Sequence, residues 1–125
     1  DASKVGFPLL HHYCAAKAEV VGLTRSLAGE LAPYGVTVNC VCPVGVSETD
    51  MGRDILEWKT AHLGLAPDDV LSATAATIPL GRNPTVADVV NAIMMFVAEE
   101  SGFLTGLAID VDGGMLSTIP IPGSS

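Results

Sequence analysis

The stretch YCAAKAEVVGLTRSLAGELAPYGVTVNCVCP, residues 13–43, decides the fold class of this chain. Residues 13–31 are rich in Ala, Leu, Glu, Lys and Arg, and their apolar side chains recur every three or four positions, which predicts a helix that Pro33 ends. The recurring apolar residues are Ala16, Val20, Leu23, Leu27 and Leu31. The β-branched run 36–41 then predicts a strand that Pro43 ends, and its apolar character is typical of a covered parallel sheet.

The rest of the chain repeats this order of elements. Residues 44–84 carry many Gly and Pro and predict a long connection, which in a compact unit is usually functional. Helical stretches are expected within it at 54–62 and 68–77. Residues 86–99 predict a second amphipathic helix with Thr85 as its N-cap, and residues 107–111 predict a second strand. The tail 117–125, rich in Pro, Gly and Ser, is expected to be loosely held.

This order indicates an α/β fold. Helix, strand, long connection, helix and strand follow one another as in the C-terminal half of a doubly wound, Rossmann-type parallel sheet, which is a three-layer αβα fold when complete. Two parallel strands alone make a poor sheet. Residues 1–125 are therefore expected to form the C-terminal part of one domain whose N-terminal half is absent.

The composition excludes several classes of function. Lys and Arg number 6 against 14 Asp and Glu, so the net charge of −8 argues against a nucleic-acid partner. The apolar runs fall short of the roughly 18 to 20 residues that span a bilayer. Hydrophobic residues make up 49% and charged residues 16%, which is too apolar for disorder and suggests that additional surface is covered by something else. The three cysteines are few and odd in number, which favours a reduced, cytoplasmic setting.

One pair of residues could carry chemistry. Tyr13 and Lys17 stand four apart on the first predicted helix, so both belong to one face. A phenol beside an ammonium forms a general acid/base pair, because the positive charge favours the phenolate and lowers the pKa of the phenol. The same spacing is also common on solvated helix faces. His11 and His12 are adjacent, which suits no metal-ligand spacing, and no metal site is expected.

A wider pattern surrounds this pair and resembles the short-chain dehydrogenase/reductase family in the family's own order. The segments that carry the resemblance are Tyr13-Cys14-Ala15-Ala16-Lys17-Ala18, residues 21–28, residues 35–43, Ile78-Pro79-Leu80-Gly81-Arg82, and Leu104-Thr105-Gly106 leading into Asp110-Val111-Asp112-Gly113-Gly114. The resemblance covers nearly the whole chain. Within the family, the chain is similar to polyol or diol dehydrogenases and to secondary-alcohol dehydrogenases.

The resemblance implies an NAD- or NADP-dependent oxidoreductase that interconverts a secondary alcohol and a ketone by hydride transfer. Tyr13 would be the catalytic acid/base, and Lys17 would bind the nicotinamide ribose and assist the tyrosine. The segment that would contact the nicotinamide end of the cofactor comprises Pro43, Val44, Gly45, Val46 and Thr49, besides Tyr13 and Lys17. Two positions depart from the family pattern, because Val44 stands where Gly is usual and Glu48 stands where Thr often falls.

Other family features are absent from the sequence. Nothing matches the glycine-rich loop that cradles the cofactor pyrophosphate. Counting back from Tyr13 puts the family's catalytic serine immediately before Asp1, and Ser3 is a weak substitute. The resemblance therefore implies a partner, the N-terminal half of the same fold, and also implies a homo-oligomer, dimer or tetramer.

A second hypothesis keeps the shape without the chemistry. The chain could be a non-catalytic, dehydrogenase-like subunit that serves assembly or binding. Retention of both Tyr13 and Lys17 favours the enzyme, because a scaffold has no physical need for that pair.

Overall fold

The computed structural model describes residues 11–117, with side chains described from residue 15 onward. Ser3 and the tail from residue 118 therefore lie outside the described residues. The elements in chain order are α1 (His11–Leu31), the 3₁₀ turn η1 (Ala32–Tyr34), β1 (Cys40–Pro43), α2 (Asp50–Leu63), α3 (Pro67–Ala76), α4 (Val86–Val97), η2 (Glu99–Ser101), β2 (Ala108–Val111) and η3 (Met115–Ser117). The chain divides into two compact units. The first is Asp1–Pro43 with Ala87–Val111, and the second is Val44–Val86 with Asp112–Ser125.

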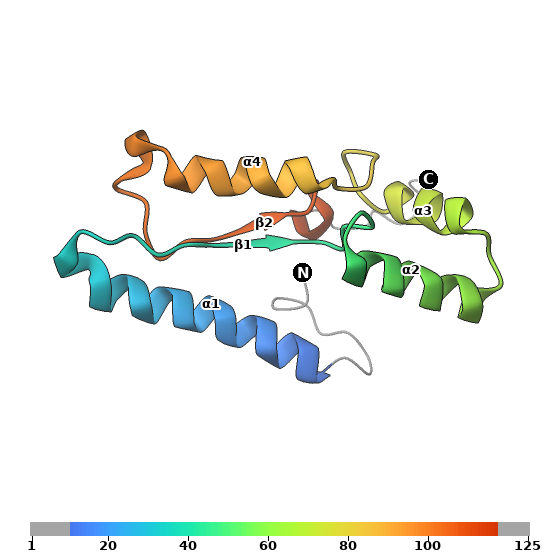
Figure 1. Cartoon of the computed structure of the whole chain (residues 1–125), viewed down its shortest axis with the longest axis horizontal. Coiled ribbons are helices and arrows are strands. Elements are labelled where there is room, and N and C mark those ends of the chain that lie inside the picture. The colour runs from blue at the N-terminus through green and yellow to red at the C-terminus, as the bar shows by residue number, and fades with distance from the viewer. Residues whose placement is uncertain (1–10, 118–125) are drawn as a thin grey trace. The chain divides into compact units, whose positions relative to one another are not determined.

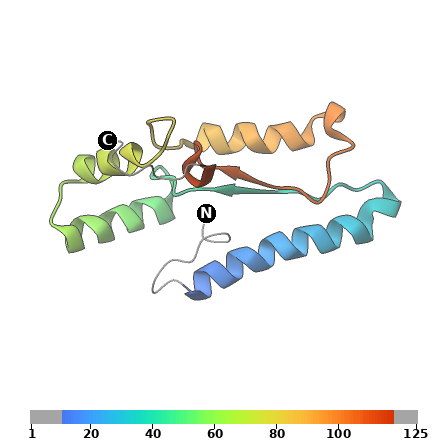
Figure 2. The same cartoon turned by 180° about the vertical axis from the view of Figure 1, so that it is seen from behind.

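The first unit is built around a parallel pair of strands. Cys40 of β1 pairs with Ala108 of β2, and the register continues to Pro43 opposite Val111. Helix α1 covers one face of the pair and α4 covers the other (Figures 1 and 2). The expected α/β class and parallel pairing are confirmed, and this unit has the three layers of an αβα fold.

Helix α1 contacts the rest of its unit through small residues. Thr24 and Ala28 are buried, and the Thr24 hydroxyl donates to the carbonyl of Val20 at 2.8 Å. Val20 and Leu23, which belong to the predicted apolar stripe, are instead half exposed. Leu27 and Leu31 of the same apolar series are half-buried. The helix therefore packs through its small residues and one edge of the apolar series.

Strand β1 begins later than the periodicity predicts. The amide of Val38 donates to the Thr105 hydroxyl at 3.0 Å, and the amide of Gly106 donates to the Val38 carbonyl at 2.8 Å. The Asn39 side chain donates to the carbonyl of Leu104 at 3.0 Å and accepts from the amide of Leu107 at 3.1 Å. Side chains thus provide hydrogen-bond partners for backbone groups in this segment, and the regular hydrogen bonding between the two strands starts only at Cys40.

The second unit packs two helices around a small core. Helices α2 and α3 contact each other, and the buried apolar residues are Val46, Val70 and Ile78. A Cβ placed on Gly113, whose φ is +60°, would lie 2.5 Å from the Cγ2 of Ile78, so this position requires glycine. Among the helices within residues 11–117, none combines the length and apolar character that a bilayer crossing needs.

Asp112 is a buried carboxylate in this unit. Its two oxygens accept from the amides of Gly114 and Leu116, both at 2.9 Å. Burial opposes the charge, but these amide hydrogen bonds outweigh it and hold the pKa of Asp112 below its ordinary value of 3.8. The carboxylate thereby fixes the turn between β2 and η3.

The first prediction concerns Asn39. Asn39→Ala removes both side-chain hydrogen bonds between the two loops, so we expect the free energy of unfolding to fall by about 2 kcal/mol. Asn91→Ala, on the exposed side of α4, is the control and should change it by less than about 0.5 kcal/mol. Chemical denaturation followed by circular dichroism measures both. Equal losses of unfolding free energy in the two variants would show that the Asn39 side chain does not join the loops.

The second prediction concerns the pH dependence of Asp112. Its pKa is lowered by folding, so its stabilisation is present above the ordinary value of 3.8 and is lost as pH falls through the folded-state pKa. We expect Asp112→Asn to melt at a lower temperature than the unaltered chain at neutral pH, with the difference shrinking at acid pH. The control is Asp54→Asn at an exposed site. A difference that stays constant with pH would contradict the assignment.

Candidate functional site

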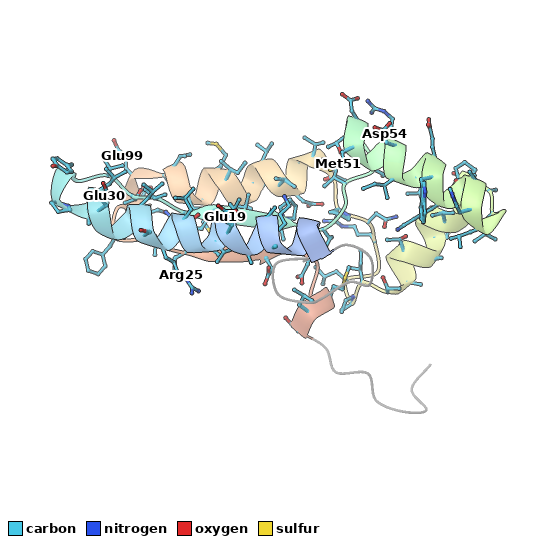
Figure 3. All side chains as sticks on the ribbon, turned by 90° about the horizontal axis from the view of Figure 1, so that it is seen from below. Glu19, Arg25, Glu30, Met51, Asp54 and Glu99 are labelled. Carbon is cyan, nitrogen blue, oxygen red and sulfur yellow. The ribbon has the colours of Figure 1, made fainter. Side chains whose placement is uncertain are left out.

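The predicted acid/base pair lies on α1. Tyr13 belongs to the first turn of this helix and Lys17 to the next, so the two residues share one face. Lys17 is exposed. The side chain of Tyr13 lies outside the described side chains. Glu19, Arg25 and Glu30 mark the further course of the helix in Figure 3.

The predicted nicotinamide segment follows β1 directly. Pro43 is the last residue of the strand and is exposed, whereas Val46 is buried with 8% of its surface accessible. Between them, a Cβ built on Gly45 would meet no atom within 4 Å. The segment is therefore anchored at Val46 and has open space beside Gly45.

Thr49 ends this segment as the N-cap of α2. Its hydroxyl accepts from the amide of Gly52 at 3.0 Å and donates to the carbonyl of Val46 at 2.8 Å. The amide of Thr49 donates to the same carbonyl at 3.1 Å. A hydroxyl has one hydrogen and two lone pairs, so one acceptor position of this exposed group is left after these bonds. Thr49 can therefore cap the helix and still accept one further hydrogen bond.

Gly52 makes this arrangement sterically possible. A Cβ on Gly52 would lie 1.9 Å from the carbonyl oxygen of Val46 and 2.9 Å from the Cα of Ser47. Both of those atoms belong to the backbone, which cannot move aside as a flexible side chain can. The first turn of α2 is therefore in direct backbone contact with the predicted nicotinamide segment.

Glu48 has a structural role that the sequence did not reveal. Its carboxylate accepts from the amide of Val86 at 2.7 Å, at the start of α4, and its carbonyl accepts from Nη1 of Arg53 at 2.7 Å. Arg53 also pairs with Asp50. An acidic group suits a helix N-terminus, but Glu48 and Val86 are far apart in sequence, so no local pattern indicates the contact.

The structure divides the predicted site residues between the units. Tyr13, Lys17 and Pro43 belong to the first unit, and Val44, Gly45, Val46 and Thr49 belong to the second. Val46 and Thr49 are directly hydrogen-bonded. Within the described part of the chain, no group of three or more His, Cys, Asp or Glu side chains could hold a metal ion.

The first unit also contains a groove that none of these residues lines. Its volume is 380 Å³. It lies between the strand segment and α4 and is lined by Thr37, Asn39, Val41, Ile93, Phe96 and Val97. The lining is mostly apolar.

Comparisons with known proteins give consistent matches. A family model described as enoyl-(acyl carrier protein) reductase matches residues 1–116. The chain is 39% identical over 114 residues to 2-(S)-hydroxypropyl-CoM dehydrogenase 3 of Xanthobacter autotrophicus, covering 91% of this chain and 42% of that protein. It is 42% identical over 115 residues to the inactive 2-(S)-hydroxypropyl-CoM dehydrogenase 2 of the same organism, covering 91% of this chain and 47% of that protein. The chain therefore spans less than half the length of these relatives.

Solved structures agree with the fold. A short chain dehydrogenase family protein from Francisella tularensis superposes with a TM-score of 0.87 at 28% identity, covering 94% of this chain and 48% of that one. A variant of actinorhodin polyketide ketoreductase, solved with NADPH, superposes with a TM-score of 0.81 at 30% identity, covering 92% of this chain and 44% of that one.

The third prediction tests the backbone contact at Gly52. Gly52→Ala forces the Val46 carbonyl and the Thr49 cap to shift, so we expect a loss of about 2 kcal/mol in the free energy of unfolding. Gly22→Ala is the matched control, because a Cβ at Gly22 on α1 meets nothing within 4 Å. That change should stabilise the helix by about 0.5 to 1 kcal/mol. Urea denaturation of both variants checks the difference, and a neutral Gly52→Ala would rule out the close approach.

Proposed function

The chain belongs to the short-chain dehydrogenase/reductase family, and from this premise we propose that residues 1–125 are the C-terminal part of one Rossmann-type domain of an NAD(P)-dependent oxidoreductase. The proposed reaction interconverts a secondary alcohol and a ketone. The observation that carries the proposal is the placement of Tyr13 and Lys17 on one face of α1, in a chain whose next strand runs into the segment Pro43–Thr49.

In the proposed reaction, Tyr13 moves the proton. Its hydroxyl donates a proton to the carbonyl oxygen during reduction and its phenolate accepts one from the alcohol during oxidation. Lys17 carries a positive charge one helical turn away, which favours the phenolate and can also hold a ribose hydroxyl. Both groups act on oxygen atoms, so they orient the carbinol or carbonyl group as well as exchange its proton.

NAD or NADP supplies the hydride acceptor or donor when it is bound. Two features of this chain support binding of its nicotinamide end. Gly45 has open space beside it, and the Thr49 hydroxyl has one lone pair left to accept from an amide N–H. The ketoreductase that superposes on this chain was solved with NADPH, which supports the assignment.

We propose that the N-terminal half of the same fold completes the site. The relatives extend over more than twice the span that this chain matches. Within the described residues, β1 and β2 form a two-stranded sheet, so each strand has one unpaired edge that another strand can extend. Several apolar side chains of α1 and α4 are also exposed, and burying them would stabilise an assembly. These are Val20, Leu23, Val90, Ile93, Met94, Met95 and Val97.

The same exposed helices support a homo-oligomer, dimer or tetramer, as a further part of the proposal. If the N-terminal half covered both helices completely, fewer of their apolar residues would be left for contact between copies of the protein. We also place the protein in the cytoplasm, because its three cysteines are few and odd in number, which is typical of a reducing compartment.

A non-catalytic subunit is the second candidate function. One observation favours it, since the relative that is 42% identical is itself described as inactive. Tyr13 and Lys17 weigh against it, because both groups of the acid/base pair are present. The two candidate functions differ in whether the assembled domain catalyses the reaction.

The fourth prediction separates them. When the chain is coexpressed with a matching N-terminal half, we expect secondary alcohols to reduce NAD or NADP. The absorbance of the reduced cofactor measures the rate. Tyr13→Phe should lower kcat by a factor of about 10² to 10⁴, because it removes the proton donor. Tyr34→Phe is the control, since Tyr34 is 79% exposed in η1, and should leave kcat unchanged. Stable assembly without turnover would favour the non-catalytic subunit, and an active Tyr13→Phe would overturn the assigned role.

A further inference from the structure

The turn that follows β2 contains a buried carboxylate that the proposed function does not use. Asp112 has only 7% of its surface exposed, and Asp112-Gly113 is the one Asp-Gly pair of the sequence. In such a pair an aspartate can react with its own backbone. Glycine has no side chain to shield its amide nitrogen, and it lets the backbone reach the conformation in which the ring closes.

The reaction is a cyclisation within the chain. The amide nitrogen of Gly113 attacks Cγ of Asp112, and a new C–N bond forms. The amide hydrogen leaves with one carboxyl oxygen and its proton as water, which gives a five-membered succinimide. Water then adds to either carbonyl of the ring. Opening at one side restores aspartate, and opening at the other side gives isoaspartate, whose main chain runs through Cβ and Cγ.

The folded turn holds both oxygens that this reaction needs. Oδ1 of Asp112 accepts from the amide of Gly114 and Oδ2 accepts from the amide of Leu116, both at 2.9 Å. Ring closure removes one of these oxygens as water, so it breaks at least one of the two hydrogen bonds. Burial opposes the charge, but the amide hydrogen bonds hold the pKa of Asp112 below 3.8. An ionised carboxylate is a poorer electrophile than a neutral carboxyl group.

The turn is also packed too closely to accept the product. The amide of Leu80 donates to the carbonyl of Gly113 at 3.1 Å, and a Cβ on Gly113 would lie 2.5 Å from Cγ2 of Ile78. An isoaspartate lengthens the main chain by one atom immediately before this contact. The turn must therefore move away from Ile78 and Leu80 before the reaction, and a chain that has reacted cannot restore the same contacts.

We propose that Asp112-Gly113 is a latent isomerisation site, which the folded turn protects and which reacts when residues 112–117 open. Local opening of this kind exposes the pair to cyclisation. The isoaspartate then keeps the turn open, so the modification accumulates in chains that have opened. All the residues involved belong to the second unit, and none takes part in the proposed hydride transfer.

The first test compares the folded and the unfolded chain. Mass-spectrometric peptide mapping measures isoaspartate at residue 112 during incubation at neutral pH, and circular dichroism verifies the folded state. Each hydrogen bond to the carboxylate shifts the opening equilibrium about tenfold, so we expect isoaspartate to form about 100-fold faster in urea. Asp112→Glu is the chemical control. Its ring would have six members and close far more slowly, so no isomer should appear even in urea.

A matched pair of variants at Leu116 tests the hydrogen bond itself. Leu116→Pro and Leu116→Ala both lose the leucine side chain, but only proline lacks the amide that donates to Asp112. We expect isoaspartate to form about tenfold faster in the folded proline variant than in the alanine variant. Equal rates in the two variants would contradict protection by this bond.

Hydrogen exchange at Leu80 gives a measurement that needs no variant. Its amide bond to the Gly113 carbonyl breaks when the turn opens. In the unaltered chain at urea concentrations below the unfolding transition, the rate of isoaspartate formation should rise in proportion to exchange of this amide. This relation tests the inference even if Leu116→Pro does not fold. Equal isomerisation with and without urea, no isoaspartate in urea, or a rate independent of Leu80 exchange would overturn the inference.

Discussion

The parallel pairing of β1 with β2 is the interaction on which the first unit depends. It joins segments that are far apart in the sequence, since Cys40 pairs with Ala108. Parallel strands need a long crossover, and here the crossover contains α2, α3 and α4. The Asn39 side chain reinforces the pairing by binding both Leu104 and Leu107. Helix α1, which carries Tyr13 and Lys17, contacts β1 of this pair.

The same pairing explains why so much apolar surface is exposed. Among the side chains of the first unit that the structure describes, only Thr24 and Ala28 of α1 are buried, and the described strands form a two-stranded sheet. Phe96 and Val89 of α4 are half-buried, while its other large apolar residues are exposed. A core of this size supplies little hydrophobic stabilisation. The exposed sides of α1 and α4 are therefore the surfaces through which additional chain would stabilise the fold.

Local patterns in the sequence predicted the elements well, whereas long-range contacts were missed. The helices, both strands and the α/β class follow from the spacing of apolar residues, from helix and strand propensities, and from the Pro and Gly residues that end the elements. The buried side of α1 could not be predicted, because Thr24 and Ala28 are less hydrophobic than the neighbouring Val20 and Leu23 that stay exposed. The late start of β1 depends on a hydrogen bond to the Thr105 hydroxyl. The hydrogen bond from the Val86 amide to the Glu48 carboxylate likewise joins residues that are far apart in the sequence. Such pairings leave no periodic signal.

The candidate site also combines local features of the sequence with contacts that only the folded chain shows. The spacing of Tyr13 and Lys17 is a local feature, and so is the run from Pro43 to Thr49. The capping role of Thr49 and the backbone contact at Gly52 emerge only from the folded chain. Gly52 has a further consequence for how this family member can diverge. A side chain at this position would overlap the Val46 carbonyl, so any replacement must move the first turn of α2 and the Thr49 cap together. Exposed positions further along α2, such as Asp54, carry no such restriction, so sequence change is expected to accumulate beyond Gly52 rather than at it.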